Sequence, residues 1–179
     1  MTVALSPTPV LETERLILRA PRAEDWPAWA AFAADERSRF VGGPLEAEAA
    51  WRAFGHVIGM WVMRGFGTFV VEPREGGAPL GMCGPWYPEG WPEPEIGWSL
   101  WSPGAEGKGH AFEAARASIA HAFGPLGWTT AVSYIDPDNA RSIALAERLG
   151  ARRDAAAAHP GIGPCLVFRH PAPAAEPSA

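Results

Sequence analysis

Apolar and polar residues follow two different periods along this chain, and their order predicts a mixed α/β fold. Seven short segments have the pattern of strands: 15–19, 66–72, 80–86, 95–101, 129–135, 151–156 and 162–169. Four longer segments carry apolar residues at helical spacing: 23–34, 45–64, 111–123 and 138–149. Because strands and helices alternate unevenly and hairpins are expected at both ends, the sheet should be mixed rather than purely parallel.

The segment 45–64 is the least regular of the expected helices. Five large apolar residues are expected on one of its faces: Trp51, Phe54, Ile58, Trp61 and Val62. Gly55 and Gly59 lower its helical propensity, so a break into two pieces stays open. Among the other tryptophans at helical spacing, Trp26 and Trp29 are assigned to the core together with Trp61.

Length and composition favour one folded domain. A chain of 179 residues, 47% of them hydrophobic, can bury about 70% of its unfolded surface in a single core. We expect this domain to span residues 1–170. The Pro/Ala-rich tail at 171–179 is expected to be disordered.

Charge and cysteine content narrow the class of protein. A net charge of −5 argues against nucleic acid as a partner. Cys83 and Cys165 lie far apart and indicate buried thiols in a reducing compartment, and their number excludes a zinc site. There is neither an N-terminal targeting pattern nor a run of 18 apolar residues. We therefore expect a cytoplasmic monomer or homodimer without a membrane partner or a bound metal.

A glycine-rich loop joins the strand 95–101 to the helix 111–123. Closely spaced glycines leave backbone N–H groups free, and the helix dipole adds positive potential, so this junction can hold a phosphate or pyrophosphate. It contains Lys108, the only lysine of the chain, and His110, which could donate to a phosphate. A P-loop is excluded because Gly109 follows the lysine, and a dinucleotide fingerprint because Phe112 stands at the third glycine position.

The stretch from Glu106 through Gly107, Lys108, Gly109 and His110 to Ala111 resembles the acyl-CoA pyrophosphate loop of the GNAT superfamily of N-acetyltransferases. That loop is usually written [Gln/Arg]-x-x-Gly-x-[Gly/Ala]. Glu106 departs from the family pattern, and a carboxylate beside a pyrophosphate is expected to repel it. Taken alone, so short a match leaves open a plain glycine-rich turn before a helix.

A second segment resembles the same family. Asn139-x-x-Ser142 followed by Leu-Gly is similar to a helix of the ribosomal-protein-alanine (RimJ/RimL-like) branch. We expect this helix to begin with Asp136 as N-cap and Pro137 at its first position, and to stop at Gly150. The resemblance extends over residues 11–169, because residues 13–16 are similar to the family's opening strand and residues 79–84 to its third.

The resemblance implies a fold and a cofactor. The fold would be a mostly antiparallel sheet of about seven strands with helices on both faces, splayed between the fourth and fifth strands, here 95–101 and 129–135. The pantetheine arm of acetyl-CoA would pair with backbone groups of Ser99, Leu100 and Trp101, and an N–H there would polarise the thioester carbonyl.

The resemblance also assigns roles on the helix that follows the fifth strand. Asn139 would bind the pantetheine amide and Ser142 the thiol or thiolate, although both residues could simply cap the helix. Many relatives carry a tyrosine general acid four residues beyond this serine. Ala146 stands at that position, which excludes a tyrosine general acid there.

Acceptor-site residues are expected just before and at the start of the fourth strand. Glu95 is the candidate general base that removes the ammonium proton, and Glu93 is the substitute; either could be an ordinary surface carboxylate. Trp86, Tyr87 and Trp91 lie in a proline-rich loop and could wall an acceptor pocket, or form a hydrophobic lid on the sheet.

The sequence therefore predicts an acetyl-CoA-dependent N-acetyltransferase. The acceptor would be a primary amine, on a small molecule or a protein N-terminus, that attacks the thioester directly. Two alternatives stay open at this point. One is a non-catalytic acyl-CoA-binding sensor or regulatory domain, and the other is a nucleotide-binding protein of a different fold.

Overall fold

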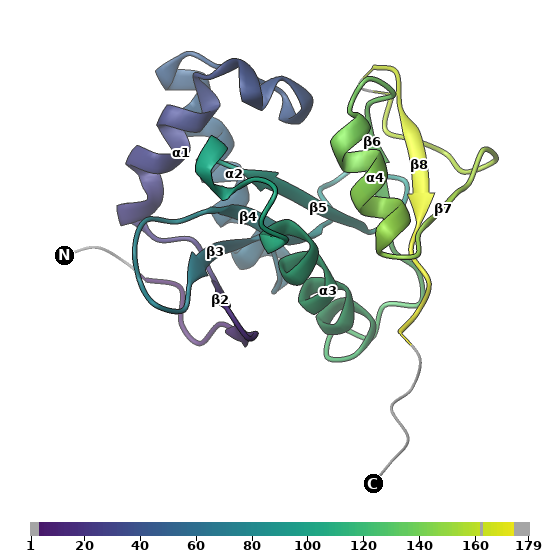
Figure 1. Cartoon of the computed structure of the whole chain (residues 1–179), viewed down its shortest axis with the longest axis horizontal. Helices are drawn as coiled ribbons and strands as arrows, with labels where there is room; N and C mark the ends of the chain where they lie inside the picture. The colour runs from purple at the N-terminus through teal and green to yellow at the C-terminus, as the bar shows by residue number, and fades with distance from the viewer. Residues whose placement is uncertain (1–3, 162, 174–179) are drawn as a thin grey trace, which may run out of the picture.

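The computed structural model describes residues 4–161 and 163–173, and over these ranges eight strands form one open sheet (Figure 1). Their order is β1-β2-β3-β4-β5-β6-β8-β7. The strands are β1 (Leu11–Glu12), β2 (Leu16–Arg19), β3 (Phe69–Pro73), β4 (Gly81–Trp86), β5 (Glu95–Leu100), β6 (Val132–Ile135), β7 (Arg152–Arg153) and β8 (Leu166–Arg169). The pairs are antiparallel except for β5 and β6, which confirms the expected mostly antiparallel sheet.

The sheet is split between β5 and β6. The strands β4 and β5 pair along six residues, whereas β5 and β6 pair in register at Glu95 and Val132 alone. Figure 1 shows β6 and β8, with α4 (Ala140–Arg148) in front, set apart from β2 to β5. The expected splay between the segments 95–101 and 129–135 is therefore confirmed.

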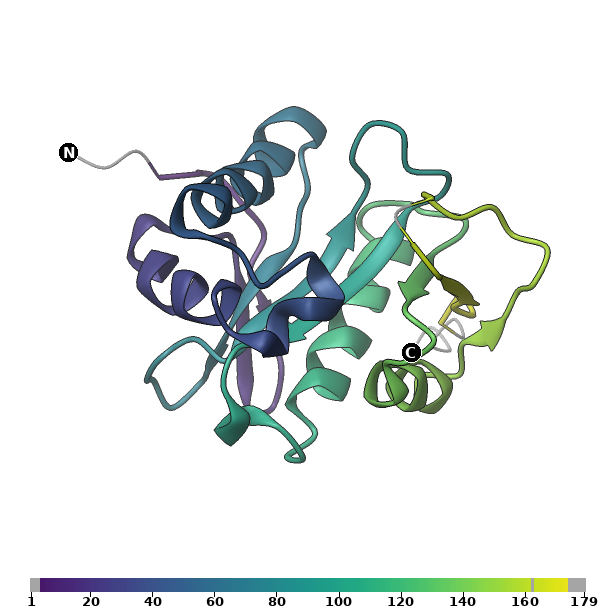
Figure 2. The same cartoon turned by 90° about the horizontal axis from the view of Figure 1, so that it is seen from above.

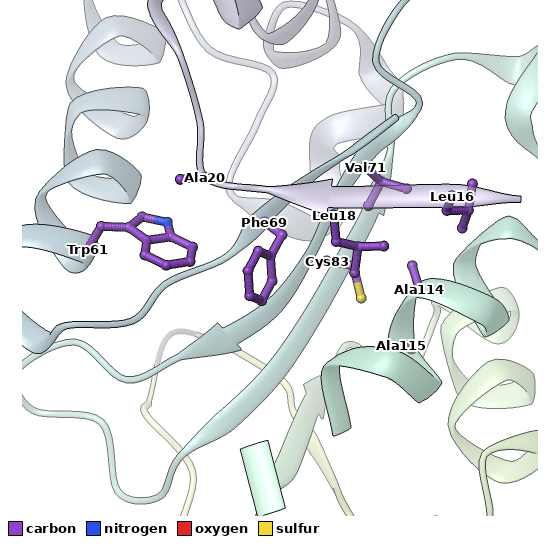
Figure 3. Packing of buried hydrophobic residues seen from close by; sticks show 9 residues of the cluster. All are labelled: Leu16, Leu18, Ala20, Trp61, Phe69, Val71, Cys83, Ala114 and Ala115. Atoms are coloured by element: carbon purple, nitrogen blue, oxygen red, sulfur yellow. The ribbon is translucent and has the colours of Figure 1, made fainter. Parts of the chain in front are cut away.

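Helices cover both faces of the sheet, as expected. The remaining helices are α1 (Trp26–Ala33), α2 (Ala47–Arg64) and α3 (His110–Phe123), with short 3₁₀ turns η1 (Ala23–Asp25), η2 (Glu36–Val41) and η3 (Pro103–Ala105). On β3, Phe69 and Val71 belong to the core cluster that includes Ala114 and Ala115 of α3 (Figure 3). Val70 between them packs against α1 and α2, as the two-residue period of a strand requires. Seen from above, η2 lies over the sheet (Figure 2).

The helix α2 differs from its expected form in two ways. It runs unbroken through Gly55 and Gly59, where an added Cβ would meet nothing within 4 Å. Trp51 and Val62 are 61% and 70% exposed, so their expected place on the apolar face was wrong. The buried stripe of this helix contains Ala50, Phe54, Val57 and Trp61. Trp51 and Val62 each come one residue after a member of this stripe, and one residue along a helix rotates the side chain by about 100°, away from the buried face.

The start of α4 also differs from the prediction. Asn139, not Asp136, is the N-cap, because its Oδ1 accepts from the Ser142 N–H at 3.2 Å. Asp136 instead accepts from the Asp138 N–H at 2.8 Å and stabilises the turn before the helix. Gly150, at φ +84°, follows the helix as expected.

The end of the chain is less regular than the pattern suggested. The strand expected at 151–156 is reduced to the two residues of β7, and β8 covers the second half of 162–169. The tail expected to be disordered lies outside the described residues from position 174 onward. Within the described ranges, none of the helices has the length and apolar character needed to cross a membrane.

Candidate active site

A cavity of about 410 Å³ lies where β5 and β6 diverge. Residues of α1, η2, α2 and β4 line one side, and residues of β6 and the start of α4 line the other. Aromatic side chains surround the part of the cavity next to α1, η2, α2 and β4, and the rest of the cavity extends to the start of α4. The residues proposed from the sequence that line it are Trp86, Trp91, Glu95, Ser99, Asn139 and Ser142.

Glu95 is the first residue of β5 and lies at the last point where β5 and β6 pair. Burial raises the pKa of its carboxyl to about 7. The Trp91 Nε1–H donates to its Oε2 at 2.7 Å, and this bond and one from the Tyr134 N–H offset part of the rise. A carboxylate that titrates near neutral pH inside a cavity is suited to general base catalysis.

Glu93, the substitute for Glu95, does not line the cavity. Its two oxygens accept from Arg169 at 2.6 and 2.9 Å, and the Thr130 hydroxyl donates to it at 3.3 Å. These bonds to Arg169 hold the pKa of Glu93 below its usual range. Its negative charge is therefore held in the ion pair with Arg169.

Ser142 lies on the first turn of α4 and lines the cavity. The Trp98 Nε1–H donates to its Oγ at 3.1 Å, so its hydroxyl proton remains free to be donated into the cavity. Asn139 uses its Oδ1 as the helix cap, which leaves its side-chain N–H groups for a ligand. Ala146 is fully buried beside Phe168, which agrees with the absence of an acid at that position.

The glycine-rich loop leads directly into α3. Gly107 and Gly109 have φ of +71° and +81°, a backbone conformation that other residues rarely adopt. The Lys108 side chain is exposed, and its carbonyl accepts from Arg15 at 2.9 Å. The Nδ1 of His110, at the start of the helix, is buried and has no partner among the described residues. A pyrophosphate fits such a cradle of free backbone groups and one unpaired imidazole nitrogen.

Glu106 is paired with two arginines rather than exposed as a free charge. Its Oε1 lies 2.7 Å from the Arg37 guanidinium, and its Oε2 accepts from Arg141 on α4. Arg37 also donates to the Leu100 carbonyl at 3.0 Å. The three side chains together carry a net positive charge, so the expected repulsion of a pyrophosphate by Glu106 is offset locally.

The backbone of β5 presents alternate residues to the cavity. The Leu100 carbonyl accepts from Arg37 on the open side of the strand, whereas the Trp101 N–H donates to Leu80 on the β4 side at 2.8 Å. Of the residues expected to pair with pantetheine, Leu100 therefore points its backbone groups toward the opening. The Trp101 N–H is not available to pantetheine, because it is bonded to the Leu80 carbonyl. The Trp101 ring is buried against Trp29.

The aromatic wall differs in part from the prediction. Trp86 and Trp91 line the cavity, but Tyr87 does not; the Arg64 guanidinium lies 5.5 Å from its ring centre. Trp29, assigned to the core from its spacing, also lines the cavity. The wall includes Phe40 and His56 as well, and nothing in the local sequence around either residue indicates this.

A buried serine and histidine join β5 to the end of β8. The Ser133 hydroxyl donates to the Ile96 carbonyl at 2.6 Å, and the His170 Nε2 lies 2.8 Å from the Ser133 Oγ. Burial lowers the pKa of His170 to about 4, so its ring is neutral and Nε2–H is the donor to serine. This pair supplies a partner for the Ile96 carbonyl where the β5–β6 ladder ends.

Comparisons with known proteins identify the family. The profile of the acetyltransferase (GNAT) domain matches residues 15–152. An acetyltransferase structure from Agrobacterium tumefaciens str. C58 is 38% identical, with 95% of this chain and 98% of that chain covered and a TM-score of 0.86. The chain therefore belongs to the GNAT acetyltransferase family, whose members transfer acyl groups from acetyl-CoA.

More distant structures share the fold. One is a putative ribosomal-protein-serine acetyltransferase from Vibrio cholerae, at 22% identity and TM-score 0.73, which covers 93% of this chain and 100% of that one. Another is RimL, a ribosomal L7/L12 alpha-N-protein acetyltransferase in complex with coenzyme A. It is 17% identical, with a TM-score of 0.70 over 90% of this chain and 96% of that chain.

Proposed function

We propose that this protein transfers the acetyl group of acetyl-CoA to the nitrogen of a primary amine. The observation that carries this proposal is the position of Glu95. Its carboxyl lines the cavity at the sheet opening and has a pKa near 7, and the free hydroxyl of Ser142 lines the same cavity. A base and a hydrogen-bond donor in one cavity are what amine acylation requires.

On the cofactor side, backbone groups at Gly107 and Gly109 and the start of α3 would hold the pyrophosphate, as the φ values and the helix terminus favour. His110 would donate to a phosphate. Arg37 and Arg141, kept in place by Glu106, would add positive potential beside the loop.

On the acceptor side, Glu95 would take one proton from the ammonium group, because an alkylamine is mostly protonated at pH 7. Acetyl-CoA supplies a thioester carbon that the neutral amine attacks and a thiolate that leaves. A β5 N–H facing the opening would stabilise the carbonyl oxygen, and Ser142 would donate to the departing sulfur. The new bond joins nitrogen to the acetyl carbon, the carbon–sulfur bond breaks, and the thiolate is protonated from the amine or solvent.

A panel of amines tests this proposal. Purified protein is incubated with acetyl-CoA and each amine, and the release of CoA thiol is followed together with the mass of the product. We expect thiol release and a product that survives hydroxylamine, as an amide does and an ester does not. Stoichiometric binding of acetyl-CoA without amine-dependent thiol release would support the sensor alternative instead.

A further inference from the structure

We infer that the acceptor is a primary amine on an uncharged, apolar body about the size of one aromatic ring, with no carboxylate beside the amine. This inference rests on the proposed N-acetyltransferase function and narrows its substrate. It comes from the charges and surfaces that surround Glu95 in the cavity.

The acceptor part of the cavity is lined mainly by aromatic rings, and its polar groups include Glu95, His56, Thr68 and the Tyr134 hydroxyl. Its wall includes rings that come from six parts of the chain: Trp29, Phe40, His56, Trp86, Trp91 and Tyr134. The Trp91 Nε1–H donates to Glu95, so this ring lies directly beside the base. Such a wall favours an apolar body next to the reacting nitrogen.

Among the residues that the structure describes, the cavity lining contains no lysine or arginine, and its acidic members are Glu95 and Asp136. A substrate carboxylate would therefore lose water without gaining a cation and would be repelled by Glu95. Two arginines near the cavity are already paired, Arg37 with Glu106 and Arg64 with Glu89 at 3.0 Å. Arg39 is exposed and lies over the ring of Phe40, 4.4 Å from its centre. Free α-amino acids are thus poor acceptors on electrostatic grounds.

A second ammonium group is also poorly matched. Asp136, the other acid of the lining, lies between β6 and α4 on the side assigned to the cofactor, and it accepts from the Asp138 N–H. The aromatic part offers rings but no second carboxylate to a polyamine. A monoamine with an apolar body fits the distribution of charge better.

The size of the cavity sets a limit on the body. An apolar cavity of roughly 150 Å³ is enough to bind benzene. The cavity of 410 Å³ must also admit the acetyl end of the donor, which leaves room for about one ring. Two kinds of acceptor amine have this chemistry: a small arylalkylamine, and the N-terminal residue of a polypeptide when its side chain is apolar.

Matched acceptors test this inference. The values of kcat/KM are measured for phenethylamine, phenylalaninamide, phenylalanine and spermidine. We expect phenylalaninamide to exceed phenylalanine by about a hundredfold, equivalent to about 2.7 kcal/mol, and phenethylamine to exceed spermidine. Equal rates for phenylalanine and its amide, or a preference for spermidine, would overturn the inference and leave the N-acetyltransferase function intact.

A tetrapeptide amide that begins with phenylalanine separates the two sources. Acetylation at the rate of phenethylamine assigns the site to polypeptide N-termini, and slow acetylation assigns it to small amines. If no amine releases thiol, the proposed function fails, and the inference is then judged by binding alone. Calorimetric titration should give tighter binding of phenethylamine than of phenylalanine, and the reverse order would contradict it.

A variant that introduces a positive charge provides a sharper test. Trp86→Arg places a cation on the cavity wall and should raise the phenylalanine-to-phenethylamine ratio of kcat/KM about tenfold. Trp51→Arg is the matched control, because Trp51 is 61% exposed on α2 and does not line the cavity. An unchanged ratio in a folded Trp86→Arg protein would show that the wall does not contact the acceptor.

Discussion

The two parts of the candidate site are built in different ways. The cofactor part relies on one continuous stretch, residues 106–111, in which backbone conformation matters most, as the positive φ of Gly107 and Gly109 shows. The acceptor part relies on side chains from α1, η2, α2, β4 and the loop before β5. A contiguous backbone motif can be read from sequence, whereas a wall assembled from distant segments cannot.

The largest expected effect concerns the backbone of the cofactor part. Gly109→Val should weaken CoA binding more than a hundredfold, because a β-branched residue resists φ +81° and its Cβ would lie 3.3 Å from Arg15 Nη2. Calorimetry measures the binding, and circular dichroism checks the fold. Gly104→Val is the control, since an added Cβ there meets nothing within 4 Å and φ is not positive. If both variants bind CoA with the affinity of the wild type, the backbone of this loop does not hold the pyrophosphate.

The next effect concerns the base of the acceptor part. Glu95→Gln should lower kcat roughly a hundredfold or more at neutral pH without weakening acetyl-CoA. The wild-type rate should rise with pH through about 7, where Glu95 loses its proton, and the variant should lose this inflection while gaining activity as free amine increases. Glu93→Gln is the control and should change kcat less than about threefold. If kcat fell strongly in Glu93→Gln and not in Glu95→Gln, Glu93 rather than Glu95 would be the general base.

The same two carboxylates should differ in stability. The folded-state pKa of Glu95 is raised, so the native state retains a proton that the unfolded state loses between pH 4.5 and about 7, and stability falls over that window. Glu95→Gln should therefore unfold at a higher urea concentration at pH 8, by about 1–2 kcal/mol after allowance for solvent contact.

The substitution Glu93→Gln should change the stability of the fold in the opposite direction, by lowering it at pH 8. The pKa of Glu93 is lowered by Arg169, so its contribution to stability is present above pH 4.5 and is lost as the pH falls below that value. Its removal should cost less than about 1 kcal/mol at pH 8. Urea unfolding of both variants at pH 5 and pH 8 measures the contrast, and equal shifts of one sign would contradict it.

A smaller effect is expected at Ser142 of α4, the proposed hydrogen-bond donor to the leaving sulfur. Ser142→Ala should lower kcat about tenfold, because it removes one hydrogen bond to the leaving sulfur. The defect should shrink with a thioester whose thiol is a better leaving group. A defect that is the same for both thioesters would mean that Ser142 serves α4 rather than the reaction.

The smallest effect is expected for the only lysine. Lys108→Ala should raise the dissociation constant of CoA less than about fivefold, since the side chain is exposed and its backbone carbonyl remains bound to Arg15. The same calorimetric titration measures it. A loss larger than that of Gly109→Val would show that side-chain charge, not backbone, holds the phosphates.

Local periodicity predicted most of the strands and helices, and closely spaced glycines indicated the loop, whereas the splay of the sheet was expected only from the resemblance to the GNAT family. The prediction from sequence misplaced the N-cap of α4, because Asp136 and Asn139 are both good capping residues and only the path of the chain decides between them. It also did not reveal that Glu106 is paired, because its partners Arg37 and Arg141 lie far away in the chain. Phe40 and His56 gave no local signal, since their role depends on how η2 and α2 pack over the sheet.

The splay also has a consequence for motion. The strands β5 and β6 are joined near the split by the bond from the Val132 N–H to the Pro94 carbonyl at 3.0 Å and by the hydroxyl bridge of Ser133. Such a joint divides the sheet into two cooperative units, so amide protons of β6 and β8 should exchange with deuterium sooner than those of β3 and β4. A ligand seated across the joint would slow that exchange, which makes protection of β6 a gauge of occupancy.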